Sequence, residues 1–170
     1  MLALIRFFID LCLLRRNPQD LPASNALLWV ALAADALIGA LVAAGAGIPL
    51  GPGLIQVLFD VALMLALLYG ALQLLGRLPR FIQSATALLG SGAVVGALAL
   101  VPVSLIPSGE QTEQSGVAAL LFLVLIAWSI LVTGHILRHT FDIRLGQGAA
   151  VAVLYNLLSY SLVGGLFTGS

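Results

Sequence analysis

Five long apolar runs occupy most of this chain of 170 residues. Each run holds roughly 20 residues, the length that an α-helix needs to cross the hydrocarbon core of a bilayer. We predict membrane spans at residues 25–44, 54–75, 81–106, 116–137 and 145–167. A helix satisfies its backbone hydrogen bonds internally, as a lipid environment requires. The sequence therefore predicts an all-α polytopic membrane bundle of five transmembrane helices, organised as a single domain over residues 1–170.

Composition excludes other classes of protein. Apolar residues make up 61% of the chain and charged residues 8%, whereas about a quarter of the residues in a soluble domain are charged. Spans of this length leave no room for a water-soluble catalytic domain. The formal net charge is zero and no Lys/Arg-rich run is present, so the basic surface of a nucleic-acid-binding protein is missing. We therefore expect the lipid bilayer, and not nucleic acid, as the partner of this chain.

The basic residues, all seven of them arginines, are distributed unevenly between the spans. Every one precedes the first span or lies in the connection after the second or the fourth: Arg6, Arg15, Arg16, Arg77, Arg80, Arg138 and Arg144. The remaining segments, 46–53, 107–115 and 168–170, contain none. By the positive-inside rule, arginine-bearing connections stay in the cytoplasm. We therefore expect a cytoplasmic amino terminus and an exterior, periplasmic carboxyl terminus.

Residues 1–16 are apolar but are too short and too charged to cross the membrane. Arg6 and Asp10 are four residues apart, which places them on one face of a helix with apolar side chains around the rest. A helix of this kind lies in the headgroup layer of the membrane. No small-residue cleavage site follows it, so we expect it to be retained rather than removed as a signal peptide. We predict an interfacial amphipathic helix over 1–16, and Ser24 as the N-cap of the first span.

Carboxyl groups fall inside the first two spans. Asp35 lies at the centre of the first span, and Asp60 lies in the second, five residues outward of the centre. A charged carboxylate at such a depth costs at least about 2.5 kcal/mol, so each must face the bundle, be protonated or reach water. No arginine or lysine lies at a matching depth. Polar partners for these groups must therefore come from neighbouring spans.

The fifth span offers such partners near its middle. Asn156 is three residues before Ser159 and four before Tyr160, so the three side chains share one helical face. We predict that Asp35 forms hydrogen bonds with this face, and that an intramembrane polar cluster forms. Its members are Asp35, Asp60, Asn156, Ser159 and Tyr160. Two interpretations stay open: acids that carry protons or cations along a transport path, or acids that only fix the packing of the helices.

Another polar group lies near the cytoplasmic end of the fourth span. His135, His139 and Asp142 are four and then three residues apart, so they align if the helix continues. Two imidazoles and a carboxylate are a recognised set of metal ligands. However, no glutamate stands between the histidines as in zinc proteases, and Arg138 and Arg144 add repulsive charge. We predict interfacial anchoring here, with no metal and no other cofactor, and keep the metal set as the alternative.

Several short segments of the chain resemble the Yip family of membrane proteins, including its bacterial members. They are Asp20-Leu21-Pro22 before the first span, Tyr69-Gly70 in the second, the series Gly90, Gly92 and Gly96 in the third, and Trp128 to Gly134 in the fourth. The resemblance implies a cytoplasmic amino-terminal segment, closely spaced spans and a non-enzymatic role in membrane organisation or trafficking. The longer motif that precedes the first span in eukaryotic members is missing, so the resemblance implies no Rab-type GTPase partner.

The sequence predicts a non-enzymatic scaffold or accessory subunit in the cytoplasmic (inner) membrane of a bacterium. Small residues let helices approach closely, so we expect other membrane proteins, or copies of this chain, as its partners. The first alternative is a small transporter or channel subunit that uses Asp35 and Asp60. The second is an enzyme at the membrane interface that uses His135 and His139. We predict no catalytic residues, because neither a Gly-x-Ser-x-Gly elbow nor a phosphate-binding loop is present.

Overall fold

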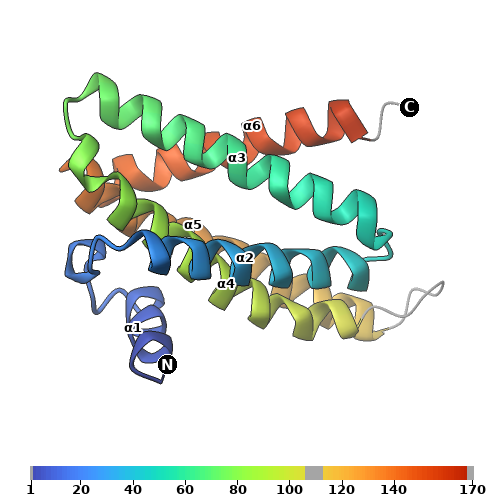
Figure 1. Ribbon diagram of the computed structural model, residues 1–170. Coiled ribbons are helices and arrows are strands. Elements are labelled where there is room, and N and C mark those ends of the chain that lie inside the picture. The colour runs from blue at the N-terminus through green and yellow to red at the C-terminus, as the bar shows by residue number, and fades with distance from the viewer. Residues whose placement is uncertain (1, 106–112, 168–170) are drawn as a thin grey trace.

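The structure, a computed structural model, describes residues 2–105 and 113–167, and all regular elements of this part are helical. The α-helices are α1 (Leu2–Cys12), α2 (Asn25–Gly45), α3 (Leu50–Leu74), α4 (Phe81–Ser104), α5 (Glu113–Phe141) and α6 (Leu145–Phe167). Short 3-10 helices, η1 (Pro18–Asp20) and η2 (Leu78–Arg80), precede α2 and α4. Figure 1 shows α2 to α6 side by side in alternating directions, with α1 set across one end.

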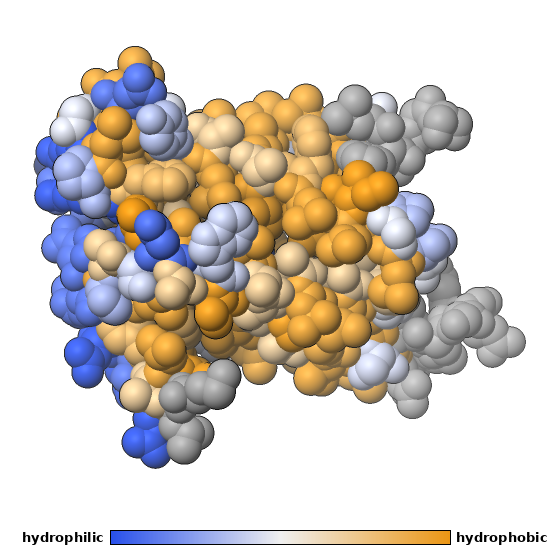
Figure 2. All heavy atoms as spheres, in the orientation of Figure 1, coloured by the Kyte–Doolittle hydropathy of each residue, from blue (hydrophilic) through white to orange (hydrophobic). Residues whose placement is uncertain are grey.

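Five helices, α2 to α6, are long and apolar enough to cross a membrane. Figure 2 shows apolar side chains covering the middle of the molecule, while hydrophilic side chains gather at its ends, most densely at the end where α1 lies. These features fit a multi-pass membrane protein. The alternating directions also bring the three arginine-bearing connections, α1–α2, α3–α4 and α5–α6, to the same end of the bundle (Figure 1).

The predicted spans match most helix boundaries. α6 covers 145–167 as predicted, and α2 ends one residue later than predicted. α3 begins at Leu50, four residues before the predicted start, because Pro52 stands in its first turn, where a missing N–H loses no helical hydrogen bond. α5 continues to Phe141, four residues beyond the predicted end. Position 106, which the third span was predicted to reach, and the predicted outer connection up to residue 112 lie outside the described residues.

Four helices end in a Schellman turn, in which the first or second residue past the helix adopts a left-handed conformation and the next amide bonds back into the last turn. Left-handed residues occupy these positions: Leu14, Gly47, Gly76 and Asp142. In α1 the amide of Arg15 donates to the Asp10 carbonyl at 2.9 Å, so the helix ends at Cys12 and not at the predicted residue 16. The start of α2 follows prediction, because the Ser24 hydroxyl accepts from the Leu27 amide.

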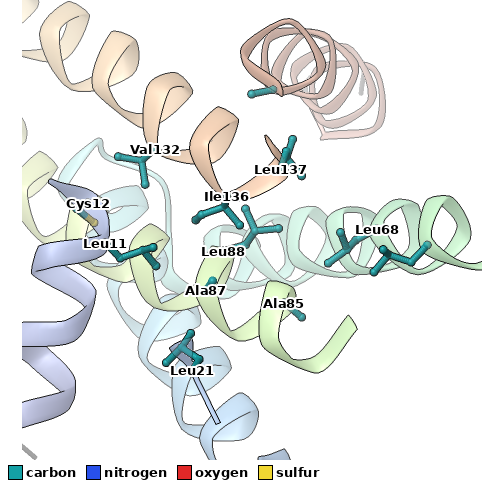
Figure 3. Packing of buried hydrophobic residues seen from close by; sticks show 12 residues of the cluster. Leu11, Cys12, Leu21, Leu68, Ala85, Ala87, Leu88, Val132, Ile136 and Leu137 are labelled. Carbon is teal, nitrogen blue, oxygen red and sulfur yellow. The ribbon is translucent and has the colours of Figure 1, made fainter. Parts of the chain in front are cut away.

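The core lies where α1, α4 and α5 meet, close to the arginine-bearing end. The stretch 84–91 of α4 is buried without interruption, which makes α4 the central helix. Leu11 and Cys12 of α1 belong to the same buried cluster as Leu88 of α4 and Ile136 of α5. Figure 3 shows Leu88 and Ile136 pointing toward one another. The amino-terminal segment is therefore packed onto the bundle.

Glycines on α4 make the closest helix contacts. A methyl group at Gly92 would lie 2.5 Å from Asp35 Oδ1, and one at Gly96 would lie 2.9 Å from Ile38 Cγ2, both on α2. A methyl group at Gly90 would overlap the ring of Phe8 on α1. The small residues of α4 therefore serve contacts within the bundle, as small residues do between membrane helices.

Candidate functional site

A cavity of 560 Å³ is lined by all five long helices, mainly by α3 to α6, while α2 contributes Asp35. The wall is mainly apolar and includes Met64 and Leu68 of α3, Val132 and Leu137 of α5, and Leu154 of α6. The volume falls within the range of small-molecule sites, about 300–1,000 Å³. The cavity is therefore large enough for a small organic ligand.

Polar side chains from several helices line one part of this cavity. They are Asp35 of α2, Asp60 of α3, Ser91 of α4, Ser129 and Thr133 of α5, and Tyr155 and Asn156 of α6. Asp35 and Asn156 are the central residues of their helices, and Asp60 lies two residues from the centre of α3. Asp60 is thus deeper than predicted, because α3 begins earlier. Within the described part of the chain, no arginine, lysine or histidine lines the cavity.

Asp60 is held from α6 by hydroxyl groups. The Tyr155 hydroxyl donates to Asp60 Oδ1 at 2.6 Å, and the Ser159 hydroxyl donates to the same oxygen. Tyr155 and Ser159 are four residues apart, so both project from one face of α6. The structure shows no donor to Asp60 Oδ2 among residues 2–105 and 113–167. One carboxyl oxygen is therefore anchored, while the other is available to a ligand.

Asp35 is placed differently. Its carboxyl packs against Gly92, where the missing side chain makes room for it. No side chain or backbone group of the described segments forms a hydrogen bond with this carboxyl. Asp35 and Asp60 line the same cavity, so the two acids form one group of carboxyls there. A cation between them would be attracted by both.

The predicted polar cluster forms in part. Asp35, Asp60 and Asn156 line the cavity, and Ser159 binds Asp60. The predicted bond between Asp35 and Asn156 is replaced by a local one, because Asn156 Nδ2 donates to the Ala152 carbonyl of its own helix at 2.8 Å. The face of α6 that meets the acids thus overlaps the predicted one in Asn156 and Ser159.

Tyr160 lies outside the cluster, since its side chain is 82% exposed. Tyr155 occupies the place that was predicted for Tyr160. Tyr155 and Ser159 are directed at Asp60, and Asn156 lines the same cavity, whereas Tyr160, about 100° further around the helix than Ser159, faces away. The i, i+4 spacing of Tyr155 and Ser159 was a visible signal, but it competed with the equal spacing of Asn156 and Tyr160.

His135, His139 and Asp142 do not gather as a metal site. The two imidazole rings are adjacent, with centroids 4.7 Å apart, and His135 Nε2 lies 3.0 Å from the Arg16 carbonyl oxygen. Asp142 leaves the α5 helix at φ 52°, and its carboxylate pairs with Arg77 and Arg80. Within residues 2–105 and 113–167, no three His, Cys, Asp or Glu side chains are arranged as metal ligands.

The Asp142 carboxylate instead joins the α3–α4 and α5–α6 connections. Asp142 Oδ2 lies 2.7 Å from Arg77 Nη1 and 3.0 Å from Arg80 Nη1. Arg80 also donates to the carbonyls of His139 at 3.2 Å and Thr140 at 3.1 Å, the last turn of α5. A positive charge is favourable at a helix carboxyl terminus. Arg77 and Arg80 therefore hold the two connections together at this end of the bundle.

Cys12 is also structural. Its thiol is buried and lies 3.9 Å from the Ser91 carbonyl, and its own carbonyl accepts from the Trp128 indole at 2.8 Å. Burial raises the pKa of the Cys12 thiol to about 11. The thiol therefore stays neutral near pH 7, whereas nucleophilic and metal-binding cysteines act as thiolates.

The chain matches no protein-family model, no curated protein and no solved structure in the comparisons made with each. The resemblance to the Yip family therefore stays a prediction. The site is interpreted from its geometry alone.

Proposed function

We propose that this protein is a small membrane transporter that moves protons, alone or together with another cation, through the cavity lined by α2 to α6. The observation that carries the proposal is the presence of Asp35 and Asp60 in one cavity whose described lining holds no basic side chain. Acids inside membrane spans are costly, and where they occur they commonly mark the paths of ions or protons. A cation pathway gives these acids a function that their position otherwise lacks.

A purely structural role for the acids is less well supported. An acid that only fixes helix packing needs donors for its oxygens, because unpaired buried polar groups are destabilising. Asp60 Oδ2 and both oxygens of Asp35 lack such donors within the described segments, and none of them is enclosed by protein, so they face the open space of the cavity. The acids are therefore oriented but incompletely satisfied, as a binding group is.

The scaffold function relied on small residues as contact surfaces for other proteins. In the bundle, Gly90, Gly92 and Gly96 are covered by α1 and α2. Gly134 and Gly148 bring α5 and α6 together, because a methyl group on either would meet backbone atoms of the other helix. These five glycines make contacts within the chain and are not available to a partner, whereas Gly70 and Gly165 stay open, so the argument for a scaffold is weakened.

The enzyme function relied on His135 and His139. His135 is buried, and its Nε2 contacts the Arg16 carbonyl oxygen at 3.0 Å. The carbonyl of His139 is occupied by Arg80. This arrangement supports an anchoring role for the pair better than a catalytic one.

We further propose that the arginine-bearing end faces the cytoplasm of a bacterium, with the protein in the inner membrane. The support is the positive-inside rule applied to the three connections that hold arginine. α1 would then lie in the cytoplasmic interface, with its exposed Ile5, Ile9 and Leu13 in the lipid and Arg6 among the headgroups. The amino terminus would be inside and the carboxyl terminus outside.

Reconstitution in liposomes tests the transport function. Under a transmembrane voltage, the purified protein should raise the proton flux above that of protein-free liposomes, measured with an internal pH dye. Asp60→Asn should lower this flux at least tenfold. Asp10→Asn is the matched control, because Asp10 lies on α1 away from the cavity. No added flux in the wild type, or equal flux in Asp60→Asn, contradicts the proposal.

A further inference from the structure

We propose that the cation bound in this cavity is an organic monocation with an apolar body, whose charged centre lies between Asp35 and Asp60. The inference rests on the transport function proposed above and names the chemical class of its substrate. It follows from the charge of the lining, the length of its apolar part and the side on which the cavity reaches the surface.

The charge of the cavity lining determines whether the ligand carries a positive or a negative charge. Asp60 has one carboxyl oxygen held by Tyr155 and Ser159 and presents the other. Asp35 faces the same cavity, and the described lining holds no basic group. In a medium of low dielectric constant, an anion would be repelled, and a neutral ligand would leave the acids without a charge partner. Two carboxyl groups in one low-dielectric cavity favour a state with a single negative charge, which a monocation compensates.

The length of the apolar part determines the body of the ligand. The lining continues along α3 from Asp60 to Ala71, eleven residues or roughly 16 Å at 1.5 Å per residue. Toward Ala71 the wall is apolar, with Leu68, Leu137 and Phe141. An inorganic cation seeks a shell of oxygen ligands and would leave this length unused. An organic cation fills it with hydrophobic contacts.

The position of the cavity determines its access. Leu67 of α3 and Leu154 and Leu158 of α6 line the cavity and are also exposed on the outer surface of the bundle. α3 and α6 contact each other much less than α5 and α6 do. The cavity thus reaches the lipid-facing surface between α3 and α6. A cation that dissolves in the membrane can enter there without crossing the polar ends of the bundle.

Equilibrium binding of tetraphenylphosphonium to the purified full chain in mild detergent tests this inference. We expect saturable binding that Asp60→Asn weakens at least tenfold, whereas Asp60→Glu, which keeps the charge, and Asp10→Asn retain it within about threefold. Tetraphenylborate has the same shape with the opposite charge and should not bind saturably. Ala71→Phe should weaken binding by narrowing the apolar part, and Ala66→Phe should not, since Ala66 is exposed on the same helix outside the cavity.

The outcomes separate the two proposals. Absence of saturable tetraphenylphosphonium binding, equal binding of tetraphenylborate, or unchanged binding in Asp60→Asn each overturns the substrate class. If proton flux still depends on Asp60 in that case, only this inference fails, and the transport function stands. If the flux is absent as well, both fail. Size-exclusion profiles and thermal unfolding of each variant show that a loss of binding does not come from unfolding, and Asp60→Glu gives a folded comparison at the same position.

Discussion

Tyr155 of α6 donates a hydrogen bond of 2.6 Å to the Asp60 carboxylate of α3, across 95 residues of sequence. The bond crosses the side of the cavity where the two helices otherwise contact each other sparingly. It therefore both orients the acid and links α3 to the rest of the bundle.

Replacing Tyr155 with phenylalanine tests this link. Tyr155→Phe should lower the free energy of unfolding by about 1–3 kcal/mol, because a hydrogen bond to a charged group is lost. Tyr160→Phe also removes a phenol hydroxyl, but from an exposed ring, and should change the free energy of unfolding by less than about 0.5 kcal/mol. Thermal or denaturant unfolding in detergent measures both. If Tyr155→Phe and Tyr160→Phe change the free energy of unfolding equally, the hydrogen bond between Tyr155 and Asp60 does not stabilise the fold.

The contact between α1 and α4 depends on Gly90. Gly90→Ala should destabilise the protein by about 1–3 kcal/mol, because the Phe8 ring must move to admit the methyl group. Gly70→Ala is the control: open space surrounds Gly70, and the substitution should be neutral or stabilising by up to about 1 kcal/mol. The free energy of unfolding is measured for both variants. A Gly90→Ala substitution without effect would contradict the packing of α1 against Gly90.

Alkylation of the Cys12 thiol should depend on pH in a range above that of an ordinary cysteine. Burial raises the pKa of this thiol from 9.0 to about 11, so between these values the unfolded chain loses the proton and the folded chain keeps it. The stability that the neutral thiol contributes is complete below pH 9 and is lost as the pH rises toward 11. Alkylation by iodoacetamide should therefore stay slow through pH 9 in the folded protein and accelerate only above it. A midpoint near pH 9 in the folded protein contradicts burial of Cys12.

Asp142 combines a charge with a left-handed backbone, and two substitutions separate these properties. Asp142→Asn should cost less than about 1 kcal/mol, because the ion pairs with Arg77 and Arg80 are half exposed and screened by water. Asp142→Val should cost about 1–2 kcal/mol more, because a β-branched residue tolerates φ 52° poorly. Unfolding at low and high salt provides the measurement, and only the charge contribution should fall with salt. Equal costs for both variants would contradict a backbone role.

The helices themselves were largely predictable, because a long apolar run and its flanking polar residues determine a membrane helix with little help from tertiary contacts. The errors lie where a local signal was weak. Pro52 falls in the segment 46–53 that was predicted to lie before the second span, although a first helical turn accepts proline equally well. The fourth span was predicted to end at 137, with its continuation to Asp142 left open; α5 continues to Phe141, and the left-handed Asp142 ends it.

Of the candidate site, only the two acidic residues could be predicted from the sequence. Asp35 and Asp60 stand out because little else in the spans is charged. The facing side of α6 was not predictable, because apolar residues surround this helix on all sides and its rotation is set by packing against α3 and α5. The cavity arises from that packing and has no signature in the sequence.

The most direct measurement of the central claim compares oppositely charged thiol reagents inside the cavity. Ser129 lines the cavity and Leu123 lies exposed on the same helix, so each is replaced by cysteine in a Cys12→Ser background. The account predicts that Ser129→Cys reacts at least tenfold faster with a cationic methanethiosulfonate than with an anionic one, and that tetraphenylphosphonium blocks the reaction, while Leu123→Cys stays unreactive. Equal rates with both reagents, or no reaction at Ser129→Cys, would contradict a cation-binding cavity between the spans.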